Sequence, residues 1–87
     1  MHVYLIESDN GYECLYKIGL SKKVERRYKE IKTGNPDILT IFDKFKTQYP
    51  YKLEKALHNM YAHLRGEGEW FKLDYNIILI LIVFIFF

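Results

Sequence analysis

The chain has 87 residues, enough for one domain near the lower size at which a single hydrophobic core is self-sufficient. Apolar residues make up 49% and aromatic residues 17%, so core-forming side chains are plentiful. The net charge of +2 is too small to establish a polyanionic partner by itself. Cys14 is the only cysteine, which excludes an internal disulfide and a zinc site of the usual kind. The N-terminus lacks signal-peptide character, and we expect a protein of a reducing intracellular compartment, cytoplasmic or nuclear and not secreted.

The first part of the chain predicts a hairpin followed by a helix. Residues 2–7 alternate in the manner of a half-buried strand, and residues 12–19 form its return strand. Asn10-Gly11 lies between them and tolerates the positive φ angles of a tight turn. A helix is expected over residues 22–33.

The second part predicts another strand and another helix. Ser21 is the expected N-cap of the first helix, and residues 38–46 are rich in Ile, Leu and Phe, as in a strand. Pro50 marks the start of a second helix over residues 51–65, which carries apolar residues at helical spacing. Residues 69–73 form a short strand or closing segment.

This order of elements predicts an α+β fold, in which helices flank a small, mainly antiparallel three-stranded sheet. We assign residues 1–76 to one domain and residues 77–87 to an apolar C-terminal tail. As a helix, the tail would span about 16 Å, roughly half of a bilayer's hydrocarbon core. Burial, or coverage by a second copy in a homo-oligomer, is therefore favoured over membrane contact. A degenerate C-terminus is the third alternative.

Basic side chains concentrate between Lys17 and Lys32, where seven Lys or Arg residues stand against two Glu residues. Such clustering suits a phosphate backbone, whereas the plainer alternative is an ordinary solvated helix face. Arg65 lies farther along, at helical spacing from Glu54 on the flank of the second predicted helix.

Two charged residues lie on or beside the apolar stripe of a predicted helix. Arg27 lies on the same side of its helix as Val24 and Ile31, so its guanidinium needs an anion. A structural carboxylate and a scissile phosphate meet that need equally well. Glu54 and His58 are one helical turn apart and could bind a divalent cation or activate water. An ordinary surface pair is the plainer alternative.

Together these motifs resemble the GIY-YIG endonuclease superfamily, in particular its phage and large-virus branch. The resemblance covers residues 2–73 and is carried by the following motifs: Tyr16-Lys17-Ile18-Gly19, Arg27, Thr33-Gly34-Asn35-Pro36, Glu54 with His58, and Gly68-Glu69-Trp70-Phe71, with His2-Val3-Tyr4 in the place of the first motif. It implies a GIY-YIG-like fold and hydrolysis of a DNA phosphodiester with one divalent metal, Mg²⁺ or Mn²⁺.

The resemblance also implies catalytic roles. Glu54 would be the metal ligand, Arg27 would hold the phosphate, and Tyr4 would position or activate the attacking water. Lys17 stands where relatives have the second motif tyrosine, so it is either a base or a phosphate contact. His58 would support Glu54 or contact phosphate.

DNA is the implied partner, and the expected contacts are Gly19, Lys22, Lys23, Arg26, Lys29 and Arg65. Tyr16 adjoins Lys17 but is expected on the opposite face of its strand, and His2 replaces the first motif glycine. Two other functions stay open: a nucleic-acid-binding module of the same fold that does not cut, and a membrane-associated or oligomeric protein organised by its apolar tail.

Overall fold

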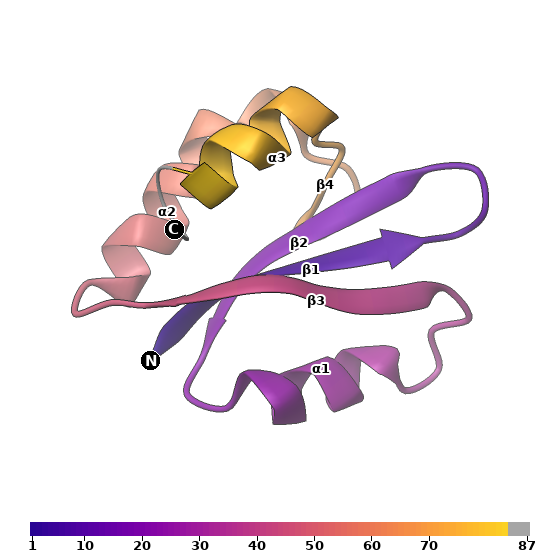
Figure 1. Cartoon of the computed structure of the whole chain (residues 1–87), viewed down its shortest axis with the longest axis horizontal. Helices are drawn as coiled ribbons and strands as arrows, with labels where there is room; N and C mark the ends of the chain where they lie inside the picture. Colours follow the sequence, from indigo (N-terminus) through magenta and orange to yellow (C-terminus); the bar gives the residue numbers. More distant parts are fainter. Residues whose placement is uncertain (84–87) are drawn as a thin grey trace.

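The computed structural model describes residues 1–83 and has a four-stranded antiparallel sheet between helices (Figure 1). The strand order is β3-β1-β2-β4. The strands are β1 (His2–Asp9), β2 (Cys14–Ser21), β3 (Ile38–Lys46) and β4 (Trp70–Phe71), and the helices are α1 (Val24–Lys32), α2 (Pro50–Met60), the 3-10 helix η1 (Ala62–Leu64) and α3 (Tyr75–Leu81).

The α+β class is confirmed, but the predicted count of three strands was wrong. The fourth strand, β4, is only two residues long, and it pairs with β2 through Tyr16 opposite Phe71 and Lys17 opposite Trp70. A segment this short carries no readable alternation, so its role as a strand follows from this pairing rather than from its own sequence.

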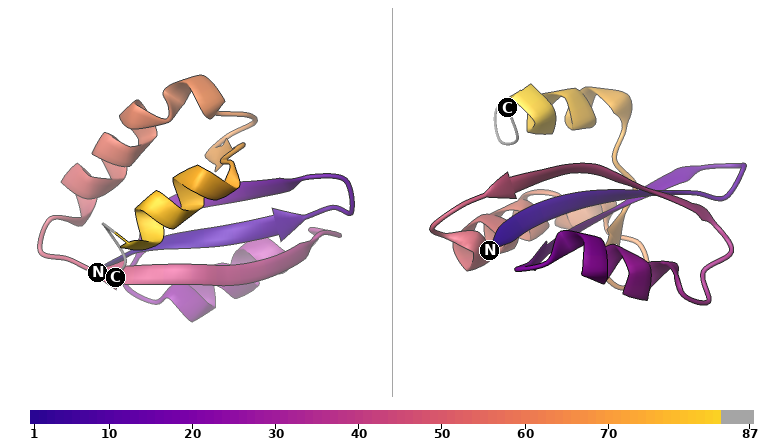
Figure 2. Two further views of the ribbon diagram at one scale, coloured as in Figure 1. Left: turned by 45° about the horizontal axis from the view of Figure 1, so that its top comes forward. Right: turned by 60° about the horizontal axis from the view of Figure 1, so that its bottom comes forward.

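Alternation along β1 divides the core between the two faces of the sheet. Val3 and Leu5 pack with α2 and α3 on one face, whereas Tyr4 and Ile6 pack against α1 on the other. Figure 2 shows α3 and α1 on opposite sides of the sheet. Tyr16 belongs to the α2 and α3 face, opposite to that of Tyr4, as predicted. The chain therefore buries apolar residues on both faces, with separate helices covering each.

Helix α1 begins two residues later than expected. Its N-cap residue is Lys23, which makes no side-chain cap, and Ser21 instead accepts a hydrogen bond from the Lys23 backbone N–H at 3.0 Å. Ser21 therefore tightens the turn before the helix, and its prediction as N-cap was wrong. The Tyr28 hydroxyl donates to the Leu39 carbonyl oxygen at 2.8 Å, which ties α1 to β3.

Helix α2 ends at Met60, before the predicted end at residue 65. The chain continues into η1, and Arg65 then pairs with Phe71 as an isolated bridge. Tyr61, beyond the helix, is buried in the core. The expected continuous helical flank from Glu54 to Arg65 is therefore interrupted.

The apolar segment near the C-terminus begins as helix α3, one of whose sides joins the core. The Asp74 side chain caps this helix by accepting a hydrogen bond from the Ile77 backbone N–H at 2.9 Å. Ile78 and Leu81 are buried in the same core as β1 and α2. The predicted division between residues 76 and 77 falls inside α3, and residues 84–87 of the predicted tail lie outside the described part.

Some apolar side chains of this segment remain exposed, namely Leu79, Ile80 and Val83. Within residues 1–83, no helix is both long and apolar enough to cross a membrane.

Candidate functional site

Tyr4 and Gly19 form the buried floor of the candidate site. They are directly opposite each other on β1 and β2, so they share the sheet face that α1 covers. A Cβ atom at Gly19 would overlap the Tyr4 ring, with Cζ at 2.5 Å and the hydroxyl closer still. Glycine at this position therefore makes room for the tyrosine, a reason for its presence that does not require a substrate.

The Arg27 side chain on α1 affects the pKa of the Tyr4 hydroxyl. Burial raises the pKa of Tyr4, while a hydrogen bond and the positive charge of Arg27 oppose that rise. The Arg27 Nη1 atom also donates to Glu30 Oε2 at 3.1 Å. Its side chain nevertheless remains 44% exposed, so the guanidinium keeps a surface that an anion from solution can reach.

Lys17 extends from β2 and is held by two partners near β4. Its Nζ donates to Glu69 Oε2 at 3.1 Å and lies 5.6 Å from the centroid of the Trp70 ring. Its side chain is only 11% exposed. Both contacts hold the Lys17 amine against β4, and its role as a base or as a phosphate contact stays a prediction.

Glu54 on α2 is half-buried and lies within electrostatic reach of the same groups. Burial raises the pKa of Glu54, and the charge of Glu69 raises it further. Electrostatic interactions with His58 and Lys17 act in the opposite direction and lower the pKa of Glu54. Tyr4 in turn senses the negative charges of both Glu54 and Glu69. Tyr4 therefore lies within electrostatic range of Arg27 and Glu54, and Glu54 lies within range of Lys17.

His58 faces the sheet backbone. Its Nε2 lies 2.6 Å from the Ile18 carbonyl oxygen, an acceptor, so this nitrogen carries the proton. Its ring also packs edge-on against Phe71, with centroids 5.0 Å apart. His58 thus links α2 to β2 by a hydrogen bond, in addition to the pairing of β2 with β4. Its catalytic role stays a prediction.

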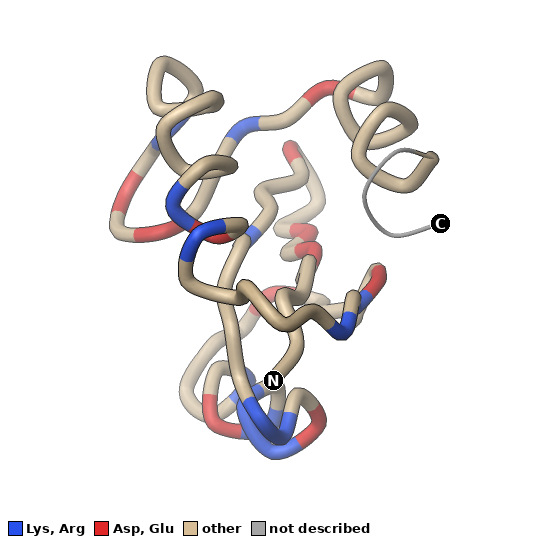
Figure 3. The backbone as a smooth tube through the Cα atoms, turned by 90° about the vertical axis from the view of Figure 1, so that its left-hand side faces the viewer, with Lys and Arg blue, Asp and Glu red and all other residues tan. Residues whose placement is uncertain are grey.

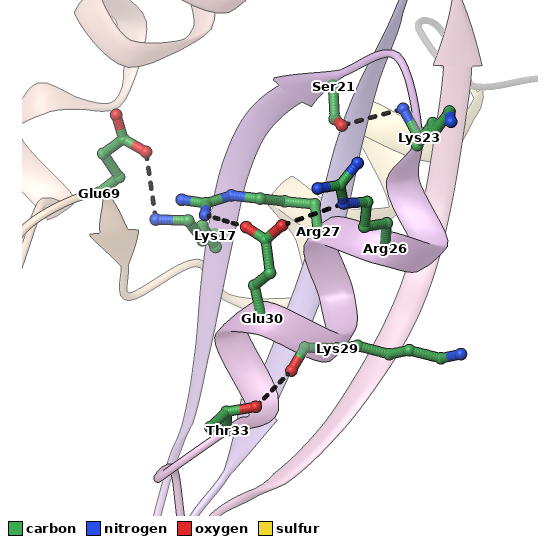
Figure 4. A network of polar contacts seen from close by, with 9 residues as sticks. All are labelled: Lys17, Ser21, Lys23, Arg26, Arg27, Lys29, Glu30, Thr33 and Glu69. Carbon is green, nitrogen blue, oxygen red and sulfur yellow. Dashed lines mark hydrogen bonds and ion pairs between the residues drawn. The ribbon is translucent and has the colours of Figure 1, made fainter.

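The basic residues at the start of α1 line an open pocket of about 350 Å³. Its lining consists of Ser21, Lys22, Lys23, Arg26, Arg27 and Glu30. Figure 3 shows Lys and Arg gathered at α1 and the connection that leads into it. Glu30 pairs with Arg27 and also with Arg26, whose Nε lies 3.6 Å from Glu30 Oε1 (Figure 4). The pocket is therefore cationic but contains its own counter-anion.

Two of the predicted DNA contacts lie away from this pocket. Lys29 extends from α1 in a different direction from Arg27 (Figure 4). Arg65 donates from Nε to the Gly68 carbonyl oxygen and lines another pocket with Glu13 and Lys72. Of the predicted contacts, Gly19 lies against Tyr4, and Lys22, Lys23 and Arg26 line the pocket with Arg27, whereas Lys29 and Arg65 do neither.

Sequence reasoning missed two carboxylates of the site, Glu69 and Glu30. Glu69 stands within a recognised motif, but only the pairing of Lys17 with Trp70 brings it beside the lysine. Glu30 carried a clearer signal, because it follows Arg26 and Arg27 at the helical spacings that form ion pairs.

The candidate metal donors of the site are two carboxylates. Within residues 1–83, no three His, Cys, Asp or Glu side chains cluster closely enough to hold a metal ion by themselves. Glu54 and Glu69 are two mutually repelling carboxylates, and Mg²⁺ commonly binds through one or two carboxylates together with water and substrate phosphates. One of these two carboxylates, Glu69, is already paired with Lys17.

The fold and the site define a small α+β domain with a cationic pocket, in which a partly exposed arginine lies beside a buried tyrosine. Comparison with known families gives the assignment: the T5orf172 domain matches residues 1–85, and the chain belongs to that family. This domain is associated with nuclease-like proteins, which supports a nucleic-acid-related function.

The chain is also similar to a viral protein. The chain is 38% identical over 84 residues to the uncharacterized protein 460R of Invertebrate iridescent virus 6. The match covers 87% of this chain and 36% of that protein, so the chain spans about a third of its relative. No solved structure matches the chain significantly.

The assignment to the T5orf172 domain corrects the resemblance to the GIY-YIG endonuclease superfamily, which was wrong. The motifs behind that resemblance have structural causes in this chain. Gly19 accommodates the Tyr4 ring, Phe71 is fully buried, and Trp70 packs beside Lys17. Packing constraints of this kind arise in many small α+β domains, so such short motifs do not identify one superfamily.

Proposed function

We propose that this chain is a metal-dependent DNA endonuclease that hydrolyses phosphodiester bonds. The observation that carries the proposal is the Arg27 guanidinium, which is partly exposed at a cationic pocket while it contacts the buried Tyr4 hydroxyl. A buried phenol beside an accessible arginine provides a phosphate-binding cation and a fixed hydrogen-bonding group at one point.

Each residue of the site has a distinct proposed task. Arg27 binds the phosphate and stabilises the charge that develops on its oxygens. Because burial raises the pKa of Tyr4, its hydroxyl keeps its proton at neutral pH and orients the attacking water by hydrogen bonding. The Lys17 ammonium, fixed by Glu69, adds positive charge near the phosphate.

Glu54 is the proposed ligand of Mg²⁺ or Mn²⁺, with Glu69 as the nearest second carboxylate. A bound divalent ion would supply Lewis-acid polarisation of a phosphate oxygen. Electrostatics favour this arrangement, because burial and the charge of Glu69 both disfavour an ionised Glu54 without a cation. His58 keeps α2 against β2 and so keeps Glu54 near the sheet.

Nicking of supercoiled plasmid tests this proposal. Wild type is incubated with Mg²⁺, Mn²⁺ or EDTA, beside Arg27→Ala and Glu54→Gln. The matched controls are Lys72→Ala, which removes an exposed cation paired with Glu13, and Glu67→Gln, which alters an exposed carboxylate. We expect metal-dependent nicking that Arg27→Ala and Glu54→Gln reduce by about 100-fold or more and the controls leave unchanged.

The same assay separates cutting from binding alone. The second candidate function is a non-catalytic nucleic-acid-binding module, which the engagement of Lys17 by Glu69 and Trp70 favours. Salt-sensitive binding that Arg27→Ala weakens, without nicking by the wild type, would replace the nuclease with this module. Equal nicking by wild type and both site variants would place the activity elsewhere.

A further inference from the structure

Two tyrosines at the start of α2 are exposed without a structural reason. Tyr49 is 62% exposed and Tyr51 is 67% exposed, on either side of Pro50. Tyr49 is the N-cap residue, a position that normally favours Ser, Thr, Asp or Asn, and its side chain makes no cap. The Tyr49 backbone N–H instead donates a hydrogen bond to Thr47 Oγ1 at 3.0 Å. Neither core packing nor helix capping accounts for these tyrosines.

Cations accompany the two tyrosines. The Lys52 Nζ atom lies 5.7 Å from the centroid of the Tyr49 ring. Residues 46–55 contain three lysines and one glutamate, so this segment is positive as well as aromatic. The same combination of aromatic faces and positive charge binds single-stranded nucleic acids in general, through base stacking and phosphate attraction.

Tyr12 provides an internal comparison. It is 97% exposed at the tip of the β1–β2 hairpin, where Asp9 and Glu13 are its charged neighbours and residues 9–14 contain no Lys or Arg. A tyrosine-rich composition explains an exposed tyrosine in either place. It does not explain why basic residues accompany the tyrosines at the start of α2 and not Tyr12.

The pairing of the strands places the two tyrosines at the same end of the sheet as the candidate site. His2 is opposite both Ser21 on β2 and Lys46 on β3, so the connections that lead to α1 and α2 leave the sheet together (Figure 1). Tyr4 is two residues from this end. The Asp9 end, which carries the hairpin, is seven residues from His2, or about 23 Å along the strand.

We propose that Tyr49 and Tyr51, with Lys52, form a stacking platform for unpaired bases of single-stranded DNA that enters the site. This inference rests on the proposed function, and it narrows the substrate to single-stranded or locally unpaired DNA. In an intact duplex the faces of the bases are covered by their neighbours. Unpaired bases can stack on the tyrosines while the cationic pocket on α1 holds the adjoining backbone.

Binding of fluorescently labelled oligothymidylate in EDTA tests the platform, with a duplex of equal length beside it. The variants are Tyr49→Ala/Tyr51→Ala, Tyr49→Phe/Tyr51→Phe and Tyr12→Ala in the full chain, each checked for folding by circular dichroism. We expect the double alanine variant to lose roughly tenfold or more in affinity for the single strand. The double phenylalanine variant and Tyr12→Ala should retain wild-type affinity, and duplex binding should change little.

Three results would overturn the platform: a loss no greater than that of Tyr12→Ala, an equal loss on the duplex, or a full loss in the phenylalanine variant. Plasmid nicking distinguishes this failure from failure of the nuclease. Nicking by the wild type with unaltered single-strand binding in the alanine variant removes only the platform. Platform-dependent binding without nicking removes only the nuclease, and absence of any DNA binding by the wild type removes both.

Discussion

The two faces of the sheet are built by alternate residues of the same strands, yet their buried tyrosines have opposite surroundings. The Tyr16 hydroxyl, on the α2 and α3 face, donates to Glu7 Oε2 at 2.8 Å, and burial together with that carboxylate raises its pKa strongly. Tyr4, on the α1 face, instead contacts Arg27. The hydroxyl of Tyr16 is paired with a carboxylate inside the fold, whereas the hydroxyl of Tyr4 lies beside an arginine that solvent can reach. The two tyrosines therefore differ in the charge beside them, a carboxylate for Tyr16 and a guanidinium for Tyr4.

The largest expected effect on stability concerns the α2 and α3 face. Leu5 is fully buried there, so Leu5→Ala should lower the free energy of unfolding by about 2–5 kcal/mol. Urea denaturation followed by Trp70 fluorescence measures the loss. A loss below about 1 kcal/mol would mean that this face contributes less to the core than its burial indicates.

Gly19→Ala should produce the next largest effect, because its methyl group overlaps the Tyr4 ring. We expect a loss of about 1–3 kcal/mol in unfolding free energy and, since the ring must move, a loss of nicking activity as well. Gly66→Ala is the matched control, as its nearest neighbour would be the Trp70 carbonyl oxygen at 3.5 Å. Equal behaviour of the two variants would contradict the close packing of Tyr4 against Gly19.

The two tyrosines allow a direct comparison of the faces. Tyr4→Phe and Tyr16→Phe each remove one hydroxyl, and each should change stability by about 0.5–1.5 kcal/mol. Only Tyr4→Phe should slow nicking, by about tenfold or more, because only Tyr4 lies beside Arg27. Single-turnover nicking rates measure this difference. Equal slowing by both variants would erase the functional distinction between the faces.

Removal of the counter-anion at the cationic pocket should have a smaller effect of opposite sign. Glu30→Gln frees Arg26 and Arg27 from their ion pairs, so affinity for DNA should rise about two- to fivefold at low salt. Fluorescence anisotropy across a salt series measures the change. Weaker binding by this variant would show that Glu30 orients Arg27 productively instead of competing with phosphate.

Glu54 should make a small pH-dependent contribution to stability. Its pKa in the folded chain is raised above the ordinary value of 4.5, so the folded state binds more protons than the unfolded state just above that value. The free energy of unfolding should therefore fall as pH rises from 4.5 through the raised pKa. Glu54→Gln should flatten this fall in urea titrations at several pH values. An unchanged slope would argue against desolvation of Glu54.

The sequence predicted most of the elements, because their signals are local. Alternation in residues 2–7, the Asn10-Gly11 turn and the apolar spacing around Leu57 each indicated the element that formed. Residues 69–73 gave no clear choice between a strand and a closing segment, because β4 is defined by its partner on β2. The end of α2 was misplaced because apolar spacing continued through Leu64 while the backbone tightened into η1.

The candidate site was predictable in its residue types but not in all of its contacts. Strand alternation separated Tyr16 from Tyr4, whereas Arg27, predicted on the inward side of α1, is exposed even though its guanidinium bonds to Tyr4. The pairing of Lys17 with Glu69 spans 52 residues and depends on tertiary register, which no local pattern encodes. The motifs did not identify the family, because packing explains the presence of several of them.

We propose above all that Tyr4 and Arg27, together with a divalent ion at Glu54 on α2, hydrolyse DNA. The most direct measurement is conversion of supercoiled to nicked plasmid by wild type, Glu54→Gln and Glu67→Gln, across a range of Mg²⁺ and Mn²⁺ concentrations. We expect metal-dependent nicking by wild type and Glu67→Gln, with activity lost in Glu54→Gln. Undiminished metal-dependent nicking by Glu54→Gln would contradict it.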